Sequence, residues 1–218
     1  MLFLLKKHFT YHITPVSLIG LVLLLLTVMI GWLLPPELGA ENSIIEWSQV
    51  LLLGLGALFA LSTLFQTSLP LPRRKLYAWS AYVFLLAMGR ELSWGRVFYM
   101  DNAGHIPLLK QLWFGPYIHP LIAAITIAAL IYFVKTGLHQ ELVSWFKGCK
   151  LPLVDILLIV CGTLLADISE HHSSGLLGSQ GEIFEELFET VVYWSLISFI
   201  CNVIQLDKQK KFLSQLQL

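Results

Sequence analysis

Charged residues are scarce in this chain: they make up 13% of its 218 residues, whereas hydrophobic residues make up 56%. The mean hydropathy is +0.73, which is far more apolar than a soluble domain of this size requires. The 14 basic residues balance the 14 acidic ones, so the total charge indicates neither a nucleic-acid-binding surface nor an acidic tail. The composition therefore predicts an integral membrane protein that binds the lipid bilayer and no nucleic acid.

Cysteine is rare as well, and its spacing excludes two classes of small stabilised domain. Cys149, Cys161 and Cys201 are far apart, so neither a disulfide framework nor a CxxC metal site is available. We expect all three to be buried as small apolar residues. The chain also lacks a nucleotide-binding glycine loop, a dinucleotide-binding glycine pattern, a GxSxG elbow and an HExxH pair, which excludes the commonest chemistries of soluble enzymes.

Long apolar runs are what the sequence has in abundance. A helix needs about 20 mostly apolar residues to cross a bilayer, and proline or glycine separates six such runs. The first run is too long for a signal peptide, so we expect it to remain as a helix. The sequence therefore predicts a single integral membrane domain over residues 1–218, with spans at about 16–34, 44–65, 76–98, 117–134, 151–168 and 183–204.

Lysine and arginine are distributed unequally between the two sides of these spans. Eleven of the 14 basic residues fall on one side, which the positive-inside rule identifies as the cytoplasm. Both termini lie on that side, so we expect an all-α, six-helix transmembrane bundle with cytoplasmic termini. The 11 residues are Lys6, Lys7, Arg73, Arg74, Lys75, Lys135, Lys147, Lys150, Lys208, Lys210 and Lys211.

Acidic residues collect on the opposite, outer side, where 11 of the 14 lie. The positive-inside rule does not require this, because acidic residues contribute little to it. Asp167 and His171 are one helical turn apart and share a face, as do Glu186 and Glu189 at the start of the sixth span. A short connection makes the two helices antiparallel neighbours, so we expect these four side chains to converge in one outward-facing pocket.

Such a cluster has the composition of a divalent metal site. Carboxylates held close together repel one another unless protons, a cation or arginine neutralise them, and Asp, Glu and His bind zinc and other divalent ions. The candidate metal ligands are Asp167, His171, Glu186, Glu189 and His119. Two simpler alternatives remain open. Glu182 and Glu185 are favoured at a helix N-terminus by the helix dipole alone, and a histidine in the position of His119 is more often an interfacial hydrogen-bonding residue than a ligand.

The third span carries charges at membrane depth. Arg90 and Glu91 are each costly there alone, so each requires a partner. We expect Glu91 to be buried with a cationic partner, Arg90 or Arg96. The nearby Trp94 is also compatible with an ordinary interfacial aromatic belt. The inner half of the spans, by contrast, shows no comparable set of polar residues.

The motif Glu-Leu-Ser-Trp-Gly at residues 91–95, the acidic segment 41–46 and the Glu-rich start of the last span resemble a family of small bacterial polytopic membrane proteins of unknown function. The resemblance implies a multi-pass protein of the bacterial inner membrane with a polar site at Glu91 and Trp94, and it implies no activity. Two features depart from the family pattern. The glutamine usual between the Gly and Arg of the motif is absent, and residues 101–110 replace a stretch rich in Asn, Leu and His.

Three classes of function fit these observations. The first is a metal-dependent hydrolase or transferase that acts on an outer-leaflet lipid or envelope intermediate; Glu91 would be the general base, and Arg90 or Arg96 would bind a phosphate or developing oxyanion. The second is a cation or proton transporter, against which the apolar inner half counts. The third is a non-catalytic assembly protein whose acidic face binds a basic partner. The sequence carries no signal for an oligomeric state.

Overall fold

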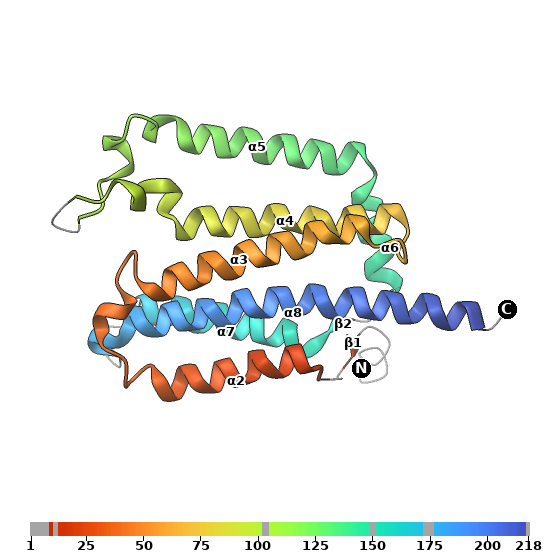
Figure 1. Cartoon of the computed structure of the whole chain (residues 1–218), viewed down its shortest axis with the longest axis horizontal. Helices are drawn as coiled ribbons and strands as arrows, with labels where there is room; N and C mark the ends of the chain where they lie inside the picture. Colours follow the sequence, from red (N-terminus) through yellow and green to blue (C-terminus); the bar gives the residue numbers. More distant parts are fainter. Residues whose placement is uncertain (1–8, 11–12, 102–104, 149–150, 172–176, 217–218) are drawn as a thin grey trace.

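The computed structural model describes residues 9–10, 13–101, 105–148, 151–171 and 177–216, and this part of the chain is almost entirely helical (Figure 1). Two-residue strands β1 (Phe9–Thr10) and β2 (Leu151–Pro152) pair in parallel. The α-helices are α2 (Pro15–Ile30), α3 (Ile44–Ser62), α4 (Leu71–Glu91), α5 (Gly115–Lys135), α6 (Leu138–Gly148), α7 (Leu153–His171) and α8 (Gly181–Leu216). Short 3-10 helices are η1 (Pro36–Gly39), η2 (Thr63–Phe65), η3 (Ser93–Tyr99), η4 (Leu109–Gln111) and η5 (Gly178–Gln180).

The long helices lie side by side and alternate in direction, while α6 runs across them (Figure 1). α8 is the longest and packs against α7, α2 and α3, and α3 packs against α4. α5 lies on the outside next to α4, where the Tyr82 hydroxyl donates a 2.6 Å hydrogen bond to Thr126 Oγ1. One end of the bundle contains the beginning of α3, the end of α4, the end of α7 and the beginning of α8. We call it the acidic end, because Glu46, Glu91, Asp167 and Glu182–Glu189 lie there.

Three helical stretches of the described chain are long and apolar enough to cross a membrane: Pro36–Phe65, Gly115–Lys135 and Gly178–Gln209. α2 is apolar but shorter. The most apolar 18-residue stretch of α5 contains no buried residue, so its hydrophobic side chains face the surroundings of the protein. Exposure of this much apolar surface is unfavourable in water and favourable in lipid, which is the environment of a membrane protein.

Small residues allow the helices of the bundle core to approach closely. Ala57, Ala60 and Ala81 are buried between α3 and α4, together with Phe84. A Cβ atom at Gly56 would lie 3.0 Å from both the Phe84 ring and the Ile197 side chain, so this glycine fits the space available. Interfaces of this composition are typical of helix packing in membranes, where van der Waals contact replaces the hydrophobic effect as the driving force.

The expected third span of 76–98 is wrong at its C-terminal end, because α4 stops at Glu91 and a non-helical turn follows. Ser93, Trp94 and Gly95 have positive φ values of 44°, 54° and 91°, a region that interrupts a helix. The turn folds the Trp94 ring back over α4. A Cβ atom at Gly89 would lie only 2.6 Å from that ring, so the close approach requires glycine at this position.

Two further expectations need correction, and one helix was not predicted. Cys161 is exposed on α7 and Cys201 is partly buried on α8, because the helix faces that carry them are not fully covered; Cys149 lies outside the described residues. Helix α6 had no counterpart in the sequence analysis. The expectation of an apolar inner half is also wrong: Asp155, Ser198 and Asn202 are buried together at the end opposite the acidic end.

Arg73 attaches the short helix α6 to the bundle. Its Nε lies 2.7 Å from Glu141 Oε1 on α6, and its Nη1 lies 3.2 Å from Asp207 Oδ2 on α8. Burial disfavours the charged guanidinium, but the Asp207 and Glu141 carboxylates outweigh that effect and raise the pKa of Arg73. Arg73 is therefore held as a cation between three helices.

Candidate functional site

Three partly or fully buried carboxylates meet where the end of α4 contacts the beginning of α8. We call Glu91, Glu186 and Glu189 the buried triad. One carboxylate oxygen from each lies within 4.8 Å of the other two. Glu91, the last residue of α4, is only 5% exposed, which confirms the expectation that it is buried. Glu186 and Glu189 occupy adjacent positions on the first turns of α8, since three residues separate them.

Two side chains, Tyr193 and Arg90, contact the carboxylates of the triad. The Tyr193 hydroxyl donates a 2.6 Å hydrogen bond to Glu91 Oε1 and lies 3.4 Å from Glu189 Oε2. Arg90 Nη2 forms an ion pair with Glu189 Oε1, and its Nε lies 3.6 Å from Glu91 Oε1. The Arg90 side chain is 59% exposed, so it reaches the triad from the solvent side. One guanidinium among three carboxylates leaves an excess of negative charge if all three are ionised.

Two buried oxygen atoms at the triad have no hydrogen-bond partner among the residues that the structure describes. They are Oε2 of Glu186 and Oε1 of Gln49, the latter on a side chain that is 0% exposed. Gln49 belongs to α3, and its Nε2 donates a 2.7 Å hydrogen bond to the main-chain carbonyl of Glu186. Unpartnered buried acceptors are unfavourable, and a cation bound to Glu186 Oε2 would satisfy that atom.

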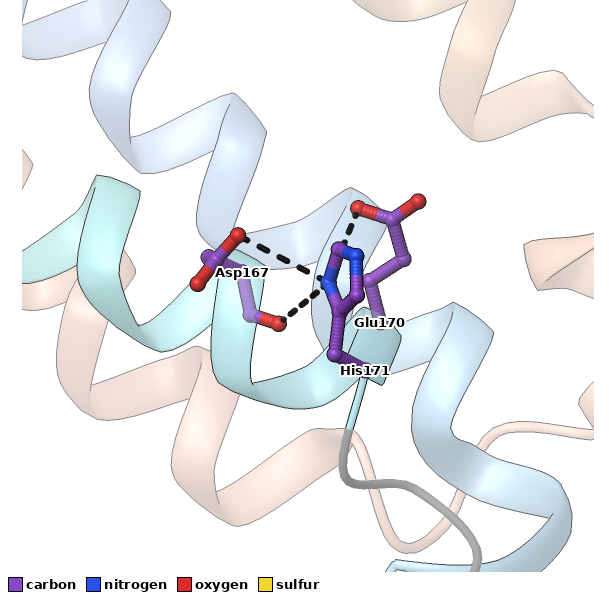
Figure 2. Close-up of side chains that lie close together, drawn as sticks. All are labelled: Asp167, Glu170 and His171. Carbon is purple, nitrogen blue, oxygen red and sulfur yellow. Dashed lines mark hydrogen bonds and ion pairs between the residues drawn. The ribbon is translucent and has the colours of Figure 1, made fainter.

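A second group of possible ligands lies on the surface at the end of α7 (Figure 2). His171 Nδ1 lies 3.6 Å from Asp167 Oδ1 and 3.6 Å from Glu170 Oε2, and it is 3.2 Å from the main-chain oxygen of Asp167. All three side chains are exposed. Exposed ion pairs of this kind contribute little to stability, so we call these three residues the surface group and assign no structural role to it.

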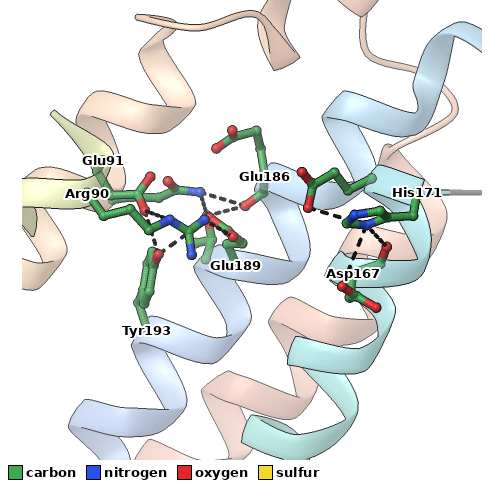
Figure 3. A network of polar contacts seen from close by, with 10 residues as sticks. Arg90, Glu91, Asp167, His171, Glu186, Glu189 and Tyr193 are labelled. Atoms are coloured by element: carbon green, nitrogen blue, oxygen red, sulfur yellow. Dashed lines mark hydrogen bonds and ion pairs between the residues drawn. The ribbon is translucent and has the colours of Figure 1, made fainter. Parts of the chain in front are cut away.

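A cavity of about 340 Å³ lies between the buried triad and the surface group. Residues of α4, α7 and α8 line it, and Figure 3 shows Glu186 and Glu189 of α8 between the Arg90 side and the Asp167 side. Its volume suits a small ligand or the polar end of a lipid. The residues that line it are Arg90, Thr163, Ala166, Asp167, Glu170, Glu185, Glu189, Val192 and Tyr193.

The four side chains that were expected to converge in one pocket therefore belong to two separate groups. Asp167 and Glu189 do line one cavity, but Glu186 belongs to the buried triad and His171 to the surface group. His119 is exposed on α5 and belongs to neither of the metal-capable groups found among the described residues. The reason is the position of α5, which lies outside the bundle beside α4 and away from α7 (Figure 1).

Arg96 does not contact the buried triad either. Its Nε donates a 2.8 Å hydrogen bond to the Pro107 carbonyl, and its Nη1 lies 3.7 Å from Glu41 Oε1. The non-helical turn after α4 explains this, because it directs residue 96 away from the face of Glu91. Arg90 is thus the arginine that accompanies Glu91, through the ion pair at 3.6 Å.

Sequence reasoning missed Tyr193, although its position contained a signal. It lies four residues after Glu189 and therefore one turn further along the same face of α8.

Glu46, which also lies at the acidic end, has a simpler explanation. Ser43 Oγ accepts a hydrogen bond from the Glu46 nitrogen and so caps α3, while the Glu46 carboxylate accepts one from the Asn42 main-chain nitrogen just before the helix.

No protein-family model, no curated protein and no solved structure matches this chain. The resemblance carried by the Glu-Leu-Ser-Trp-Gly motif therefore stays a prediction. The motif nevertheless has a distinct local structure, because it contains the buried Glu91 and the turn that folds Trp94 over α4.

Proposed function

We propose that this protein is a metal-dependent membrane hydrolase or transferase that acts on an outer-leaflet lipid or an envelope intermediate. The observation that carries the proposal is the buried triad, whose carboxylate oxygens lie within 4.8 Å of one another next to a cavity of about 340 Å³. Three carboxylates offer hard oxygen ligands for a divalent cation. A cation bound there would activate a water molecule and polarise a substrate oxygen at the cavity wall.

The proposed topology places all six long helices across a bacterial inner membrane, with both termini in the cytoplasm. The helices α2, α3, α4, α5, α7 and α8 alternate in direction, as consecutive spans must. Arg73, Lys135 and Lys147 lie at the end opposite the acidic end, which supports this orientation through the positive-inside rule. The cavity would then open toward the outer leaflet.

The proposed ligand set differs from the one that sequence reasoning favoured. Glu91 joins Glu186 and Glu189 as a ligand, since all three carboxylates meet at one point, and it no longer stands apart as a general base. Arg90 is exposed and lines the cavity, so it is the group that would bind a phosphate or a developing oxyanion. Asp167 would contribute from the opposite wall of the cavity, whereas His171 does not line it.

Metal analysis of the full chain purified in detergent tests the first part of the proposal. We expect a stoichiometric divalent metal in the wild type and its loss in Glu186→Gln. The matched control is Glu182→Gln, which removes an exposed carboxylate from the same helix end and should retain the metal. Absence of metal from the wild type after purification, together with no rise in thermal stability when MgCl₂, MnCl₂ or ZnCl₂ is added, would refute the metal site.

The second part of the proposal is the reaction. Purified protein in mixed micelles should release the head group, or inorganic phosphate, from lipid phosphate esters in a metal-dependent manner, and Arg90→Gln should reduce this release. Metal binding without turnover, combined with cation flux into proteoliposomes, would favour a transporter. If the protein neither binds metal nor carries cation flux, and Glu186→Gln loses a basic protein that co-purifies with the wild type, an assembly function would be favoured.

A further inference from the structure

An apolar cavity of about 220 Å³ lies at the end of the bundle opposite the acidic end, where α4, α5, α6 and α8 come together (Figure 1). Of the described residues that line it, all except Tyr77 and Ser80 are aliphatic, phenylalanine or tryptophan. Trp145 and Val203 in the lining are 4% and 1% exposed, whereas Phe146 is 50% exposed. The cavity therefore extends from a buried floor to the surface of the protein.

The two hydroxyl groups in the lining are bonded within the protein. The Tyr77 hydroxyl donates a hydrogen bond to Asp207 Oδ2, and Ser80 Oγ donates one of 2.5 Å to the Tyr77 main-chain carbonyl. A pair of rings from α4 and α5 contributes to the wall, with the centroids of Trp79 and Phe133 4.8 Å apart. The cavity therefore favours an apolar ligand, because burial of apolar surface is the interaction that its wall offers.

Two of the stretches that are apolar enough to cross a membrane contribute to the lining. They are Gly115–Lys135, through Phe133, and Gly178–Gln209, through Phe199 and Ile200. In a bilayer crossed by these stretches, the surface around the opening faces lipid acyl chains. Pockets that enclose a whole small ligand typically have about 300–1,000 Å³, so this smaller cavity fits one part of a larger molecule, such as a single acyl chain.

Basic residues accompany the cavity on three of its helices. Lys75 on α4, Lys135 on α5 and Lys147 on α6 each lie within two residues of a residue that lines it. In the predicted topology, this side of the chain carries 11 of the 14 basic residues but three of the 14 acidic ones. Lysine and arginine at the ends of membrane-spanning helices attract anionic lipid head groups. A second copy docked symmetrically by this face would instead bring two basic surfaces together.

We propose that this cavity binds one acyl chain of an anionic phospholipid, with the head-group phosphate beside Lys75, Lys135 and Lys147. In the proposed topology the lipid belongs to the inner leaflet, so this site is separate from the proposed substrate site at the acidic end. The most apolar stretch of α5 contains no buried residue, so a chain in the cavity adds contacts that α5 lacks in the protein alone. The lipid thereby stabilises the packing of α5 and α6 on α4 and α8.

Thermal unfolding of the full chain in detergent tests the proposal. Phosphatidylglycerol and phosphatidylcholine with identical acyl chains are titrated separately, so that the head-group charge is the variable. We expect phosphatidylglycerol to raise the unfolding midpoint in a saturable manner and by more than phosphatidylcholine does. Equal midpoints in the two lipids would overturn the proposal.

Two serines provide matched variants for the cavity itself. Ser80 lines it, whereas Ser62 on α3 does not, although Ser62 Oγ also donates a hydrogen bond to a main-chain carbonyl of its own helix, at 2.6 Å. Ser80→Met lengthens a side chain of the wall and should reduce the rise with phosphatidylglycerol at least twofold, while Ser62→Met should keep it. Equal rises in the two variants would contradict the site. A smaller particle mass of Ser80→Met in light scattering, with an unchanged response to lipid, would assign the cavity to a second copy instead.

Lysine variants and fluorescence test the site without a change of cavity volume, in case Ser80→Met does not fold. Lys147→Gln should reduce the preference for phosphatidylglycerol, and the control Lys110→Gln on η4 should retain it; equal preferences would contradict the head-group contact. Trp145 is almost completely buried, so an acyl chain reaches it through the cavity. Phosphatidylglycerol brominated on its acyl chains should therefore quench more intensity in the wild type than in Trp145→Phe. Equal losses in both proteins would overturn the assignment of an acyl chain.

Discussion

The Tyr193 hydroxyl donates a 2.6 Å hydrogen bond to Oε1 of Glu91, and this bond joins the last residue of α4 to the fourth turn of α8. Glu91 is almost completely buried, so its carboxylate depends on such donors. The same hydroxyl lies near Glu189, and Arg90 approaches both carboxylates from the exposed side. The positions of the Glu91 and Glu189 side chains are therefore linked, because each group that holds Glu91 also contacts Glu189.

Replacement of Tyr193 by phenylalanine should measurably destabilise the protein. The change leaves the ring in place and removes a hydrogen bond to the Glu91 carboxyl group, which is worth about 1.5–3 kcal/mol of unfolding free energy when that group is ionised. Tyr82→Phe is the control, since it removes the 2.6 Å bond between two neutral hydroxyl groups, worth about 0.5–1.5 kcal/mol. Chemical unfolding in detergent gives both values. A larger loss in Tyr82→Phe than in Tyr193→Phe would contradict an ionised Glu91 at this contact.

The beginning of α8 depends on a close approach by η1. A Cβ atom at Gly39 would lie 2.5 Å from the Ile183 main-chain nitrogen and 2.8 Å from the Glu182 carbonyl carbon. Main-chain atoms cannot move aside cheaply, so Gly39→Ala should cost about 1–3 kcal/mol of stability, the usual range for overpacking. Gly54→Ala is the matched control, because the nearest atom to its added Cβ would be the Met88 sulfur at 3.8 Å. Equal melting temperatures for the two variants would show that η1 does not constrain α8.

Hydrophobic periodicity and punctuation were sufficient to predict helices at all six expected positions. The all-helical character follows from the composition, because residues in a bilayer must satisfy their main-chain groups within the segment. The pairing of Glu186 with Glu189 followed from helical spacing alone. The turn after Glu91 could not be predicted, since Ser93 and Trp94 are not residues that usually adopt positive φ values.

The remaining errors in the sequence-based predictions concern features that tertiary packing determines. Nothing in the local sequence distinguishes α5 from the other apolar helices, yet it lies outside the bundle and keeps His119 away from α7. Asp155 is a single acidic residue in the first turn of α7, where a solvated residue is the usual expectation. Its burial depends on Ser198 and Asn202, which are more than 40 residues away in the sequence.

The proposed topology makes a prediction that needs no purified protein. Reporter domains fused after Lys75, Lys150 and Leu218 should all report a cytoplasmic location, because the basic residues that define the inner side precede these points. Fusions after Ala40 and Asp101 should report the outside. A single fusion at Lys75, Lys150 or Leu218 that reports the outside would overturn the six-span arrangement.

Removal of Arg90 tests whether its guanidinium and a divalent metal neutralise the same carboxylates. In Arg90→Gln, Glu189 loses its ion pair and Glu91 loses a nearby positive charge, so the three carboxylates of the triad repel one another more strongly. In the presence of a chelator, the variant should lose about 1–3 kcal/mol of unfolding free energy, the cost of leaving partly buried acceptors unpaired.

Added Mn²⁺ or Mg²⁺ should raise the unfolding midpoint of Arg90→Gln by more than it raises that of the wild type, because the metal then supplies the missing charge. Arg96→Gln is the control. Its guanidinium contacts the Pro107 carbonyl and Glu41 instead of the triad, so its response to divalent ions should equal that of the wild type. If Arg90→Gln and Arg96→Gln respond alike to both ions, the triad is not a divalent-cation site and its carboxylates serve only to anchor Arg90 between α4 and α8.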